Sequence, residues 1–264
     1  MILNNKLLLD VCNVAIEAGI EILTFYKNDI KVTHKEDLSP LTKADLASNK
    51  IILESLKKLN SNIPILSEES LVDWEIRKNW KKYWLVDPLD GTKEFIKKNG
   101  EFTVNIALVE NNNPTLGVIY VPAKSLLYLA EKDKGSFKTN TKDKLKNFEG
   151  IQKILVSSQM NRARVIGSRS HSNATFDNWV KEKFPNAEIV QAGSSLKFCL
   201  IAEGEADIYP RFGPTSEWDI AAGHILVNEA GGKIRTFQND SISYNTKENI
   251  INPEFYVIGN IDLK

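Results

Sequence analysis

The sequence of 264 residues has few of the residue types on which several common kinds of site depend. It contains two cysteines, Cys12 and Cys199, which lie far apart and match no metal-binding or redox motif. We expect two reduced, buried thiols rather than a disulfide. Only three histidines are present, and none lies at the spacing of a zinc motif. These shortages argue against a disulfide scaffold, a thiol redox centre and a zinc site.

The chain also lacks a charge excess and long hydrophobic segments. Lys plus Arg and Asp plus Glu number 34 each, so no net positive charge favours a nucleic acid polymer or an anionic membrane. No apolar stretch approaches the roughly 20 residues that cross a bilayer, and Met1–Asn5 do not begin a signal peptide. We therefore expect no integral membrane segment and a cytoplasmic location, with peripheral association at the inner membrane as an alternative. Monomer and homodimer both remain open.

The composition and the pattern along the chain indicate an ordinary globular protein. Hydrophobic residues make up 42% and charged residues 26%, and the length suits one or two closely packed domains. Residues 132–150 are charged and poor in large apolar side chains, so we expect a loop or an irregular edge there. We divide the chain at its end, into an N-terminal half over 1–150 and a C-terminal half over 151–264. The fold class is mixed α/β, in two layered halves.

Periodic apolar residues predict the main helices and strands. In chain order these are a helix over 8–25, a helix beginning near 43, strands at 64–66, 83–86, 103–110 and 115–120, a strand at 154–157, a helix at 174–184, a strand at 188–191, a helix at 195–202 and a last helix from 218 to the glycines at 231–232. The strands at 103–110 and 115–120 are expected to form a hairpin.

The most informative segment is Asp87-Pro88-Leu89-Asp90-Gly91-Thr92, which follows an apolar strand. Proline fixes φ between the two aspartates, so the turn can point both carboxylates and the Leu89 carbonyl at one place. Gly91 permits a tight turn, and Thr92 can begin a short helix, up to Ile96, whose free N–H groups suit a phosphate. The structural alternative is an Asp-Pro turn whose aspartates cap the following helix.

Other acidic residues occur in similar settings, with Glu68 and Glu69 after a short apolar strand and Asp219 at a helix start. Together with the segment at 87–92, Leu66-Ser67-Glu68-Glu69 and Trp218-Asp219-Ile220-Ala221-Ala222-Gly223 resemble the signature of the inositol monophosphatase superfamily. Members of that superfamily are magnesium-dependent phosphomonoesterases. The resemblance implies an α/β (α+β) fold, namely the layered αβαβα sandwich of the inositol monophosphatase and sugar phosphatase type.

The resemblance also implies two or three Mg²⁺ ions in the active site. The implied ligands are Glu68, Asp87, the Leu89 carbonyl, Asp90 and Asp219, with Glu69 behind them. The chemistry of these residues agrees independently, because all are hard oxygen donors of the kind that Mg²⁺ prefers. Clustered carboxylates would also repel one another strongly without a cation between them.

The expected mechanism is direct in-line attack of a metal-activated water, with no phosphoenzyme. Thr92 can orient this water, but its hydroxyl is too weak a base to act alone. By resemblance, Asp45 pairs with Thr92 and helps to bind a further Mg²⁺, so both are candidate catalytic residues. From the residues alone, Asp45 would be an ordinary aspartate in the first turn of a helix.

The second half carries three segments that suit phosphate or base recognition, Gly167–His171, Gly193–Phe198 and Tyr209–Arg211. These segments resemble the bacterial 3'(2'),5'-bisphosphate nucleotidase branch of the superfamily. That resemblance implies hydrolysis of 3'-phosphoadenosine 5'-phosphate to AMP and phosphate in sulfur metabolism. The implied substrate-binding residues are Asp90, Gly91, Thr92, His171, Ser194, Lys197, Arg211 and Asp219.

Several alternatives remain at this point. The same site could act on an inositol monophosphate or a fructose bisphosphate, and the chain could be a non-catalytic metal- or nucleotide-binding regulator. His171 could cap a helix, Lys197 could be solvated and Arg211 could form a surface ion pair. We expect His224 and Trp218 to be packing residues.

Overall fold

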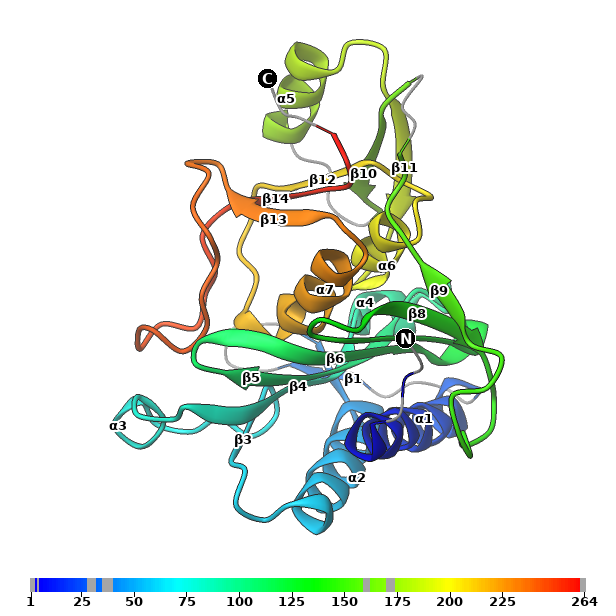
Figure 1. The fold of residues 1–264 in the computed structure, drawn as a ribbon, viewed down its shortest axis with the longest axis vertical. Helices are drawn as coiled ribbons and strands as arrows, with labels where there is room; N and C mark the ends of the chain where they lie inside the picture. Colours follow the sequence, from blue (N-terminus) through cyan, green and yellow to red (C-terminus); the bar gives the residue numbers. More distant parts are fainter. Residues whose placement is uncertain are drawn as a thin grey trace.

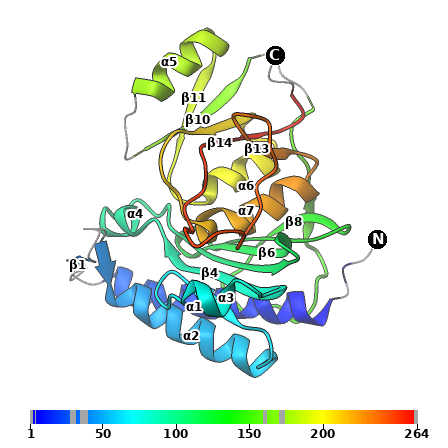
Figure 2. The same ribbon diagram turned by 90° about the vertical axis from the view of Figure 1, so that its left-hand side faces the viewer.

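A computed structural model describes residues 3, 5–27, 32–34, 40–158, 162–169 and 174–261. The helices and sheets are stacked in five alternating layers, which Figure 1 shows from the helix pair α1 and α2 at the bottom to α5 at the top. A second view shows the same order, with α6 and α7 between the two large sheets (Figure 2). The predicted αβαβα sandwich is confirmed.

The lower sheet has seven strands in the order β3-β4-β5-β6-β7-β8-β9, antiparallel except for the β3–β4 pair. Its strands are β3 (Ile65–Ser67), β4 (Lys82–Asp90), β5 (Thr103–Glu110), β6 (Asn113–Val121), β7 (Leu126–Glu131), β8 (Gly135–Asn140) and β9 (Gln152–Ile154). The expected β5–β6 hairpin is present. Asn111 and Asn112 both have positive φ, 48° and 65°, as a two-residue hairpin turn with a matching twist requires.

Two expectations about this part of the chain need correction. Residues 132–134 and 141–150 are irregular as expected, but 135–140 form strand β8, which pairs with β7 on one side and β9 on the other. Gly135, Ser136 and Phe137 are buried there, so the strand is stabilised by its neighbours although much of the stretch is charged. The strand expected at 154–157 is displaced, because β9 ends at Ile154 and belongs to the lower sheet.

The upper sheet has five strands in the order β11-β10-β12-β14-β13, with β11, β10 and β12 parallel and the β12–β14 and β13–β14 pairs antiparallel. Its strands are β10 (Arg164–Ser168), β11 (Glu188–Ala192), β12 (Ile208–Arg211), β13 (Lys233–Thr236) and β14 (Phe255–Ile258). A separate two-stranded sheet pairs β1 (Val32–His34) with β2 (Pro40–Thr42). The chain passes from the lower to the upper sheet between residues 154 and 164.

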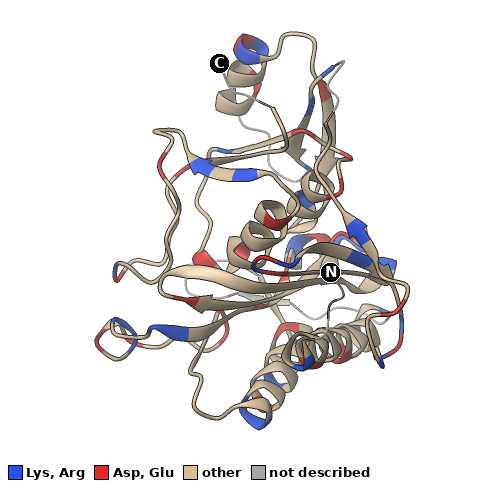
Figure 3. Ribbon diagram, in the orientation of Figure 1, with Lys and Arg blue, Asp and Glu red and all other residues tan. Residues whose placement is uncertain are grey.

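The helices follow the predicted apolar pattern, since α1 and α2 bury one face against the lower sheet. Their bounds are α1 (Lys6–Tyr26), α2 (Lys43–Leu59), α3 (Trp74–Arg77), α4 (Thr92–Ile96), the 3₁₀ turn η1 (Pro122–Lys124), α5 (Ala174–Lys183), α6 (Leu196–Ala202) and α7 (Glu217–Glu229). None of the helices in the described part of the chain is long and apolar enough to cross a bilayer. Basic and acidic residues are interspersed along the ribbon in Figure 3.

Helix α7 is held very closely between β6 and α6, and two glycines make this possible. A Cβ on Gly117 of β6 would lie 2.4 Å from Ile225, and one on Gly223 of α7 would lie 2.3 Å from Phe198. Any side chain at either position would clash with its neighbour. The packing fixes the first turn of α7, which contains Asp219, relative to the lower sheet. Cys12 and Cys199 are free and buried in the two cores, as predicted.

Candidate active site

The turn at 87–92 lies where β4 ends, and the antiparallel pairing of β4 with β5 shifts register between Asp87 and Asp90. Ser48 of α2 donates a hydrogen bond of 2.7 Å to the Pro88 carbonyl and so holds the turn from below. Gly91 has φ +86°, a conformation that side chains disfavour, and α4 begins at the next residue. The predicted tight turn and short helix are therefore both present.

Each aspartate of the predicted site has one carboxylate oxygen anchored by nearby polar groups. Asp87 Oδ1 accepts from the Leu89 N–H at 3.1 Å, and Asp219 Oδ2 accepts from the Ser216 N–H at 2.9 Å in the capping box of α7. Asp90 Oδ2 accepts from the Ser195 N–H at 2.5 Å and lies 2.7 Å from Ser195 Oγ. Anchoring one oxygen fixes the rotamer of the carboxylate and the direction of the second oxygen.

Asp45 shows the same arrangement and joins α2 to the turn. Its Oδ2 accepts from both the N–H and the hydroxyl of Thr42, at 2.8 and 2.6 Å, which completes the capping box of α2. Its Oδ1 accepts from the Thr92 hydroxyl at 3.1 Å. Asp45 is only 2% exposed, and burial raises the pKa of its carboxyl above the usual range. The structure thus combines the helix-cap role with the predicted contact to Thr92.

One cavity of about 830 Å³ collects almost all of the predicted site residues in its wall. The predicted residues that line it are Glu68, Asp87, Leu89, Asp90, Gly91, Thr92, Ser194, Lys197, Arg211 and Asp219. Asp45 lies behind Thr92, to which it is hydrogen-bonded. His171 lies outside the described residues. Of Glu68 and Glu69, only Glu68 is among the described residues that line the cavity, while the Glu69 N–H points to the Ser67 hydroxyl at 3.4 Å.

The carboxylates in this wall interact strongly with one another. Burial, followed by the charges of Glu68, Asp90 and Asp219, raises the pKa of Asp87 well above its usual range. Burial and then the charge of Asp90 do the same to the pKa of Asp219. In the part of the chain that the structure describes, no three His, Cys, Asp or Glu side chains form a ready-made metal site. The carboxylates are therefore close neighbours, but their oxygens do not converge on a single metal position.

The first turn of α6 and the end of β12 bring positive charge to the same cavity. Lys197 is 7% exposed rather than solvated, and burial lowers the pKa of its ammonium group to about 8, although Asp90 acts in the opposite direction. Its Nζ also lies 5.4 Å from the ring centre of Tyr209. The Arg211 guanidinium donates to the carbonyls of Gly213 and Pro214, at 3.2 and 2.9 Å. The guanidinium thus closes its own loop, and no ion pair of Arg211 with another of the described residues is seen, contrary to the alternative of a surface ion pair.

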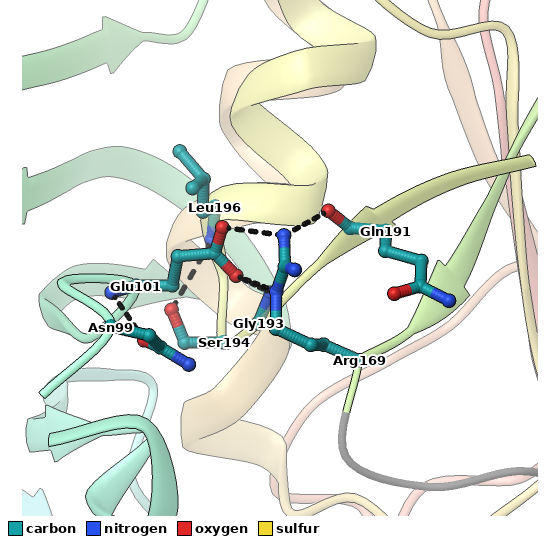
Figure 4. A network of polar contacts seen from close by, with 7 residues as sticks. All are labelled: Asn99, Glu101, Arg169, Gln191, Gly193, Ser194 and Leu196. Atoms are coloured by element: carbon teal, nitrogen blue, oxygen red, sulfur yellow. Dashed lines mark hydrogen bonds and ion pairs between the residues drawn. The ribbon is translucent and has the colours of Figure 1, made fainter. Parts of the chain in front are cut away.

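A polar network that the sequence did not reveal fixes the loop that carries Ser194 (Figure 4). Glu101, which precedes β5, forms a two-pronged ion pair with Arg169 at 2.8 and 2.9 Å and accepts from the Gly193 N–H at 2.9 Å. Arg169 also donates to the Gln191 carbonyl at 2.9 Å. A single buried carboxylate therefore joins the lower half of the molecule to β10 and β11.

Two glycines let these segments approach. A Cβ on Gly193 would lie 2.6 Å from the Glu94 side chain, and one on Gly91 would lie 3.0 Å from Ser194 Cβ. Ser194 itself has φ +44°, so the loop bends sharply at this residue. Its hydroxyl is 3.3 Å from that of Thr103 on β5.

Ser195 is a second residue that sequence reasoning missed. Its Oγ lies 2.7 Å from Asp90 Oδ2, 2.8 Å from the Asp219 carbonyl and 2.8 Å from the amide nitrogen of Asn105, which donates to it. The hydroxyl therefore links two of the predicted ligands to β5. Its position inside the Gly-Ser-Ser run was the available signal, because that run supplies two adjacent hydroxyls.

His224 and Trp218 are packing residues, as expected. His224 is 5% exposed, its Nδ1 lies 2.9 Å from the Tyr244 hydroxyl, and burial lowers its pKa to about 3. Trp218 is 7% exposed and lies in the core between the sheets. The low pKa keeps the His224 imidazole neutral at neutral pH, and neither residue is among the described residues that line the cavity.

Comparison with known protein families shows to which family the chain belongs. The sequence profile of the inositol monophosphatase family matches residues 5–258. The chain belongs to the inositol monophosphatase family. Curated relatives described as 3'(2'),5'-bisphosphate nucleotidase CysQ include the Salmonella typhimurium protein, 43% identical over 94% of this chain and 97% of the relative. The Buchnera aphidicola protein of the same description is 47% identical over 95% of this chain and 93% of the relative.

Solved structures agree with the family assignment. CysQ from Bacteroides thetaiotaomicron, a bacterial family member, has a TM-score of 0.85 and 39% identity, with 96% of this chain and 97% of that chain covered. The Thermotoga maritima inositol monophosphatase has a TM-score of 0.76 at 22% identity, over 95% of this chain and 90% of that chain. This second likeness shows the fold alone.

Proposed function

We propose that the protein is a magnesium-dependent 3'(2'),5'-bisphosphate nucleotidase that converts 3'-phosphoadenosine 5'-phosphate to AMP and phosphate. The observation that carries the proposal is the shared wall of one cavity, which contains the carboxylates of the β4 turn and α7 together with Lys197 and Arg211. One part of this wall suits cations and the other suits a phosphate. The family and the names of the relatives point to the same reaction.

The donor chemistry of the cavity fits Mg²⁺. The proposed ligands are Glu68, Asp87, the Leu89 carbonyl, Asp90 and Asp219, all of which line the cavity. All are oxygen donors. Burial and then the charges of neighbouring carboxylates raise the pKa values of Asp87 and Asp219, and a divalent cation would relieve this repulsion. When bound, the metal supplies Lewis-acid activation of a water and stabilises the leaving oxygen.

The residues around the metal ligands direct the attacking water. Because the Thr92 hydroxyl donates a hydrogen bond to Asp45 Oδ1, its lone pairs are free to accept a hydrogen bond from a water in the cavity. Asp45 lies deeper and is already anchored through its other oxygen, so it can take up a proton passed through Thr92. We assign Thr92 the role of orienting the water and Asp45 that of the base behind it.

The second phosphate would bind at Ser194, Lys197 and Arg211. Gly193 and Ser194 present the start of α6 to the cavity, and Lys197 projects from its first turn. A phosphate there would stabilise the charged form of Lys197 and so oppose the lowering of its pKa by burial. A substrate with two phosphates therefore uses both parts of the cavity at once, which a monophosphate cannot do.

The test is phosphate release from 3'-phosphoadenosine 5'-phosphate, inositol 1-phosphate and fructose 1,6-bisphosphate, each with Mg²⁺ and with EDTA. We expect Mg²⁺-dependent release that strongly favours the nucleotide. Preference for inositol 1-phosphate would keep the metal chemistry and reject the assignment of Lys197 and Arg211. Preference for fructose 1,6-bisphosphate would keep both parts of the cavity and reject the nucleotide as substrate. No release from folded protein with Mg²⁺ would favour a non-catalytic binding protein instead.

A further inference from the structure

Aromatic side chains that have no role in the proposed phosphate hydrolysis form part of the cavity wall. Phe176 of α5 and Phe212, the residue after β12, line the same cavity as the carboxylates. Hydrolysis of a phosphate ester requires metal ligands, a directed water and cations, and none of these roles needs an aromatic ring. The two rings therefore call for a separate explanation.

Both rings are held in place by their surroundings. The Phe212 ring stacks on Phe237 with centroids 4.7 Å apart and planes 13° apart, and Trp179 lies 5.9 Å from Phe212 and 6.1 Å from Phe237. The Phe176 ring lies so close to β10 that a Cβ on Gly167 would be 3.2 Å from its Cζ. Such a rigid, partly buried surface needs little reordering when a flat ligand is placed on it.

The chain joins this surface directly to the proposed phosphate site. Arg211 and Phe212 are consecutive residues, and the two hydrogen bonds from Arg211 to the carbonyls of Gly213 and Pro214 close the loop around Phe212. A ligand whose phosphate meets Arg211 thus has an aromatic ring beside it. Inositol and sugar phosphates carry hydroxyls rather than a flat apolar face, whereas every nucleobase has a π-face.

We propose that Phe176 and Phe212 form the nucleobase site of this cavity and supply its selectivity for a nucleotide over a sugar or inositol phosphate. The proposal rests on the proposed function, because it assumes that a nucleotide is the substrate. The cavity of about 830 Å³ is within the 300–1,000 Å³ range typical of pockets that enclose drug-sized ligands. Stacking a base on an aromatic side chain contributes about 1–3 kcal/mol, which is roughly 5- to 150-fold in affinity.

The experiment measures the contribution of the base alone. The Kd of adenosine 5'-phosphate and that of ribose 5-phosphate are determined by calorimetry with Mg²⁺, and their ratio is compared between proteins. The variants are Phe212→Leu, Phe212→Trp and Phe176→Leu. Phe184→Leu is the matched control, because Phe184 packs on Trp179 at 5.6 Å but is not among the described residues that line the cavity. Thermal unfolding checks that each variant is folded.

We expect the wild-type protein to favour adenosine 5'-phosphate by at least roughly 5-fold. Phe212→Leu and Phe176→Leu should each reduce this preference roughly 5-fold or more, while Phe212→Trp and Phe184→Leu should retain it. A wild-type ratio near one, or folded leucine variants with the wild-type ratio, would overturn the proposal. The measurement is separate from the proposed function: absence of phosphate release from 3'-phosphoadenosine 5'-phosphate would reject the reaction, and the Kd ratio would still test the base site.

Discussion

Replacing Ser195 with alanine tests how much the orientation of the Asp90 carboxylate matters, because all of the proposed metal ligands stay in place. The change removes the hydroxyl that lies 2.7 Å from Asp90 Oδ2 and 2.8 Å from the Asp219 carbonyl, and it keeps the Ser195 N–H bond of 2.5 Å. A hydrogen bond to a charged group contributes about 1.5–3 kcal/mol. The loss also leaves the amide nitrogen of Asn105 without the acceptor it has at 2.8 Å.

Residues that orient metal ligands typically change metal affinity or activity by about 10- to 100-fold when they are replaced. We therefore expect Ser195→Ala to lower kcat/KM for 3'-phosphoadenosine 5'-phosphate by roughly that factor and to raise the Mg²⁺ concentration needed for half-maximal rate. The assay is phosphate release over a Mg²⁺ titration. Ser136→Ala is the matched control, since Ser136 is also buried and donates its hydroxyl to a carbonyl of α7, that of Leu226. An unchanged Mg²⁺ titration for folded Ser195→Ala would refute this reasoning.

Three further predictions concern charge. Asp45→Asn should lower kcat by roughly 100-fold or more with little change in KM, measured by initial rates; full turnover would remove Asp45 from the mechanism. Since burial lowers the pKa of Lys197 to about 8, kcat/KM for the bisphosphate should fall as the pH rises from 7 to about 9, and Lys197→Gln should flatten this part of the pH profile. Because the pKa values of Asp87 and Asp219 are raised in the folded protein, their protonated forms favour the folded state when no metal is bound. This contribution to the free energy of unfolding is fully present below about pH 4 and is lost as the pH rises through the raised pKa values. In EDTA, the Tm of the wild-type protein should therefore rise more on acidification from pH 8 to 5 than the Tm of an Asp87→Asn variant. Added Mg²⁺ should raise the Tm of the wild-type protein more at pH 8 than at pH 5.

The sequence predicted those parts of the molecule that local patterns determine. The helix at α1, the β5–β6 hairpin and the turn at 87–92 follow from apolar periodicity, paired asparagines and the Asp-Pro-Leu-Asp-Gly-Thr run. Strand β8 was missed because its stability comes from pairing on both edges, not from its own residues. Strand pairing of this kind is a property of the whole sheet and leaves little trace in one segment.

The polar contacts between the two halves could not be predicted from the sequence either. Glu101 and Arg169 are 68 positions apart, and their separate neighbours in the sequence give no sign that they meet. Their ion pair becomes meaningful only with Gly193, whose missing side chain leaves room for the Glu94 side chain and whose N–H reaches Glu101. Long-range contacts of this kind depend on the folded backbone, so a single sequence does not specify them.

At Asp45 and Asp219, a hydrogen bond that caps a helix is compatible with the roles that we propose for these residues. A carboxylate has two oxygens, and in each residue Oδ2 closes a capping box while Oδ1 is left for another partner. At Asp45 that partner is Thr92, at 3.1 Å. The capping bond to Oδ2 stabilises the helix and also fixes the direction of Oδ1. No further residue is needed to orient the carboxylate. A local pattern that indicates a cap is therefore no argument against a role in the site, because the capping bond to Oδ2 also sets the direction of Oδ1.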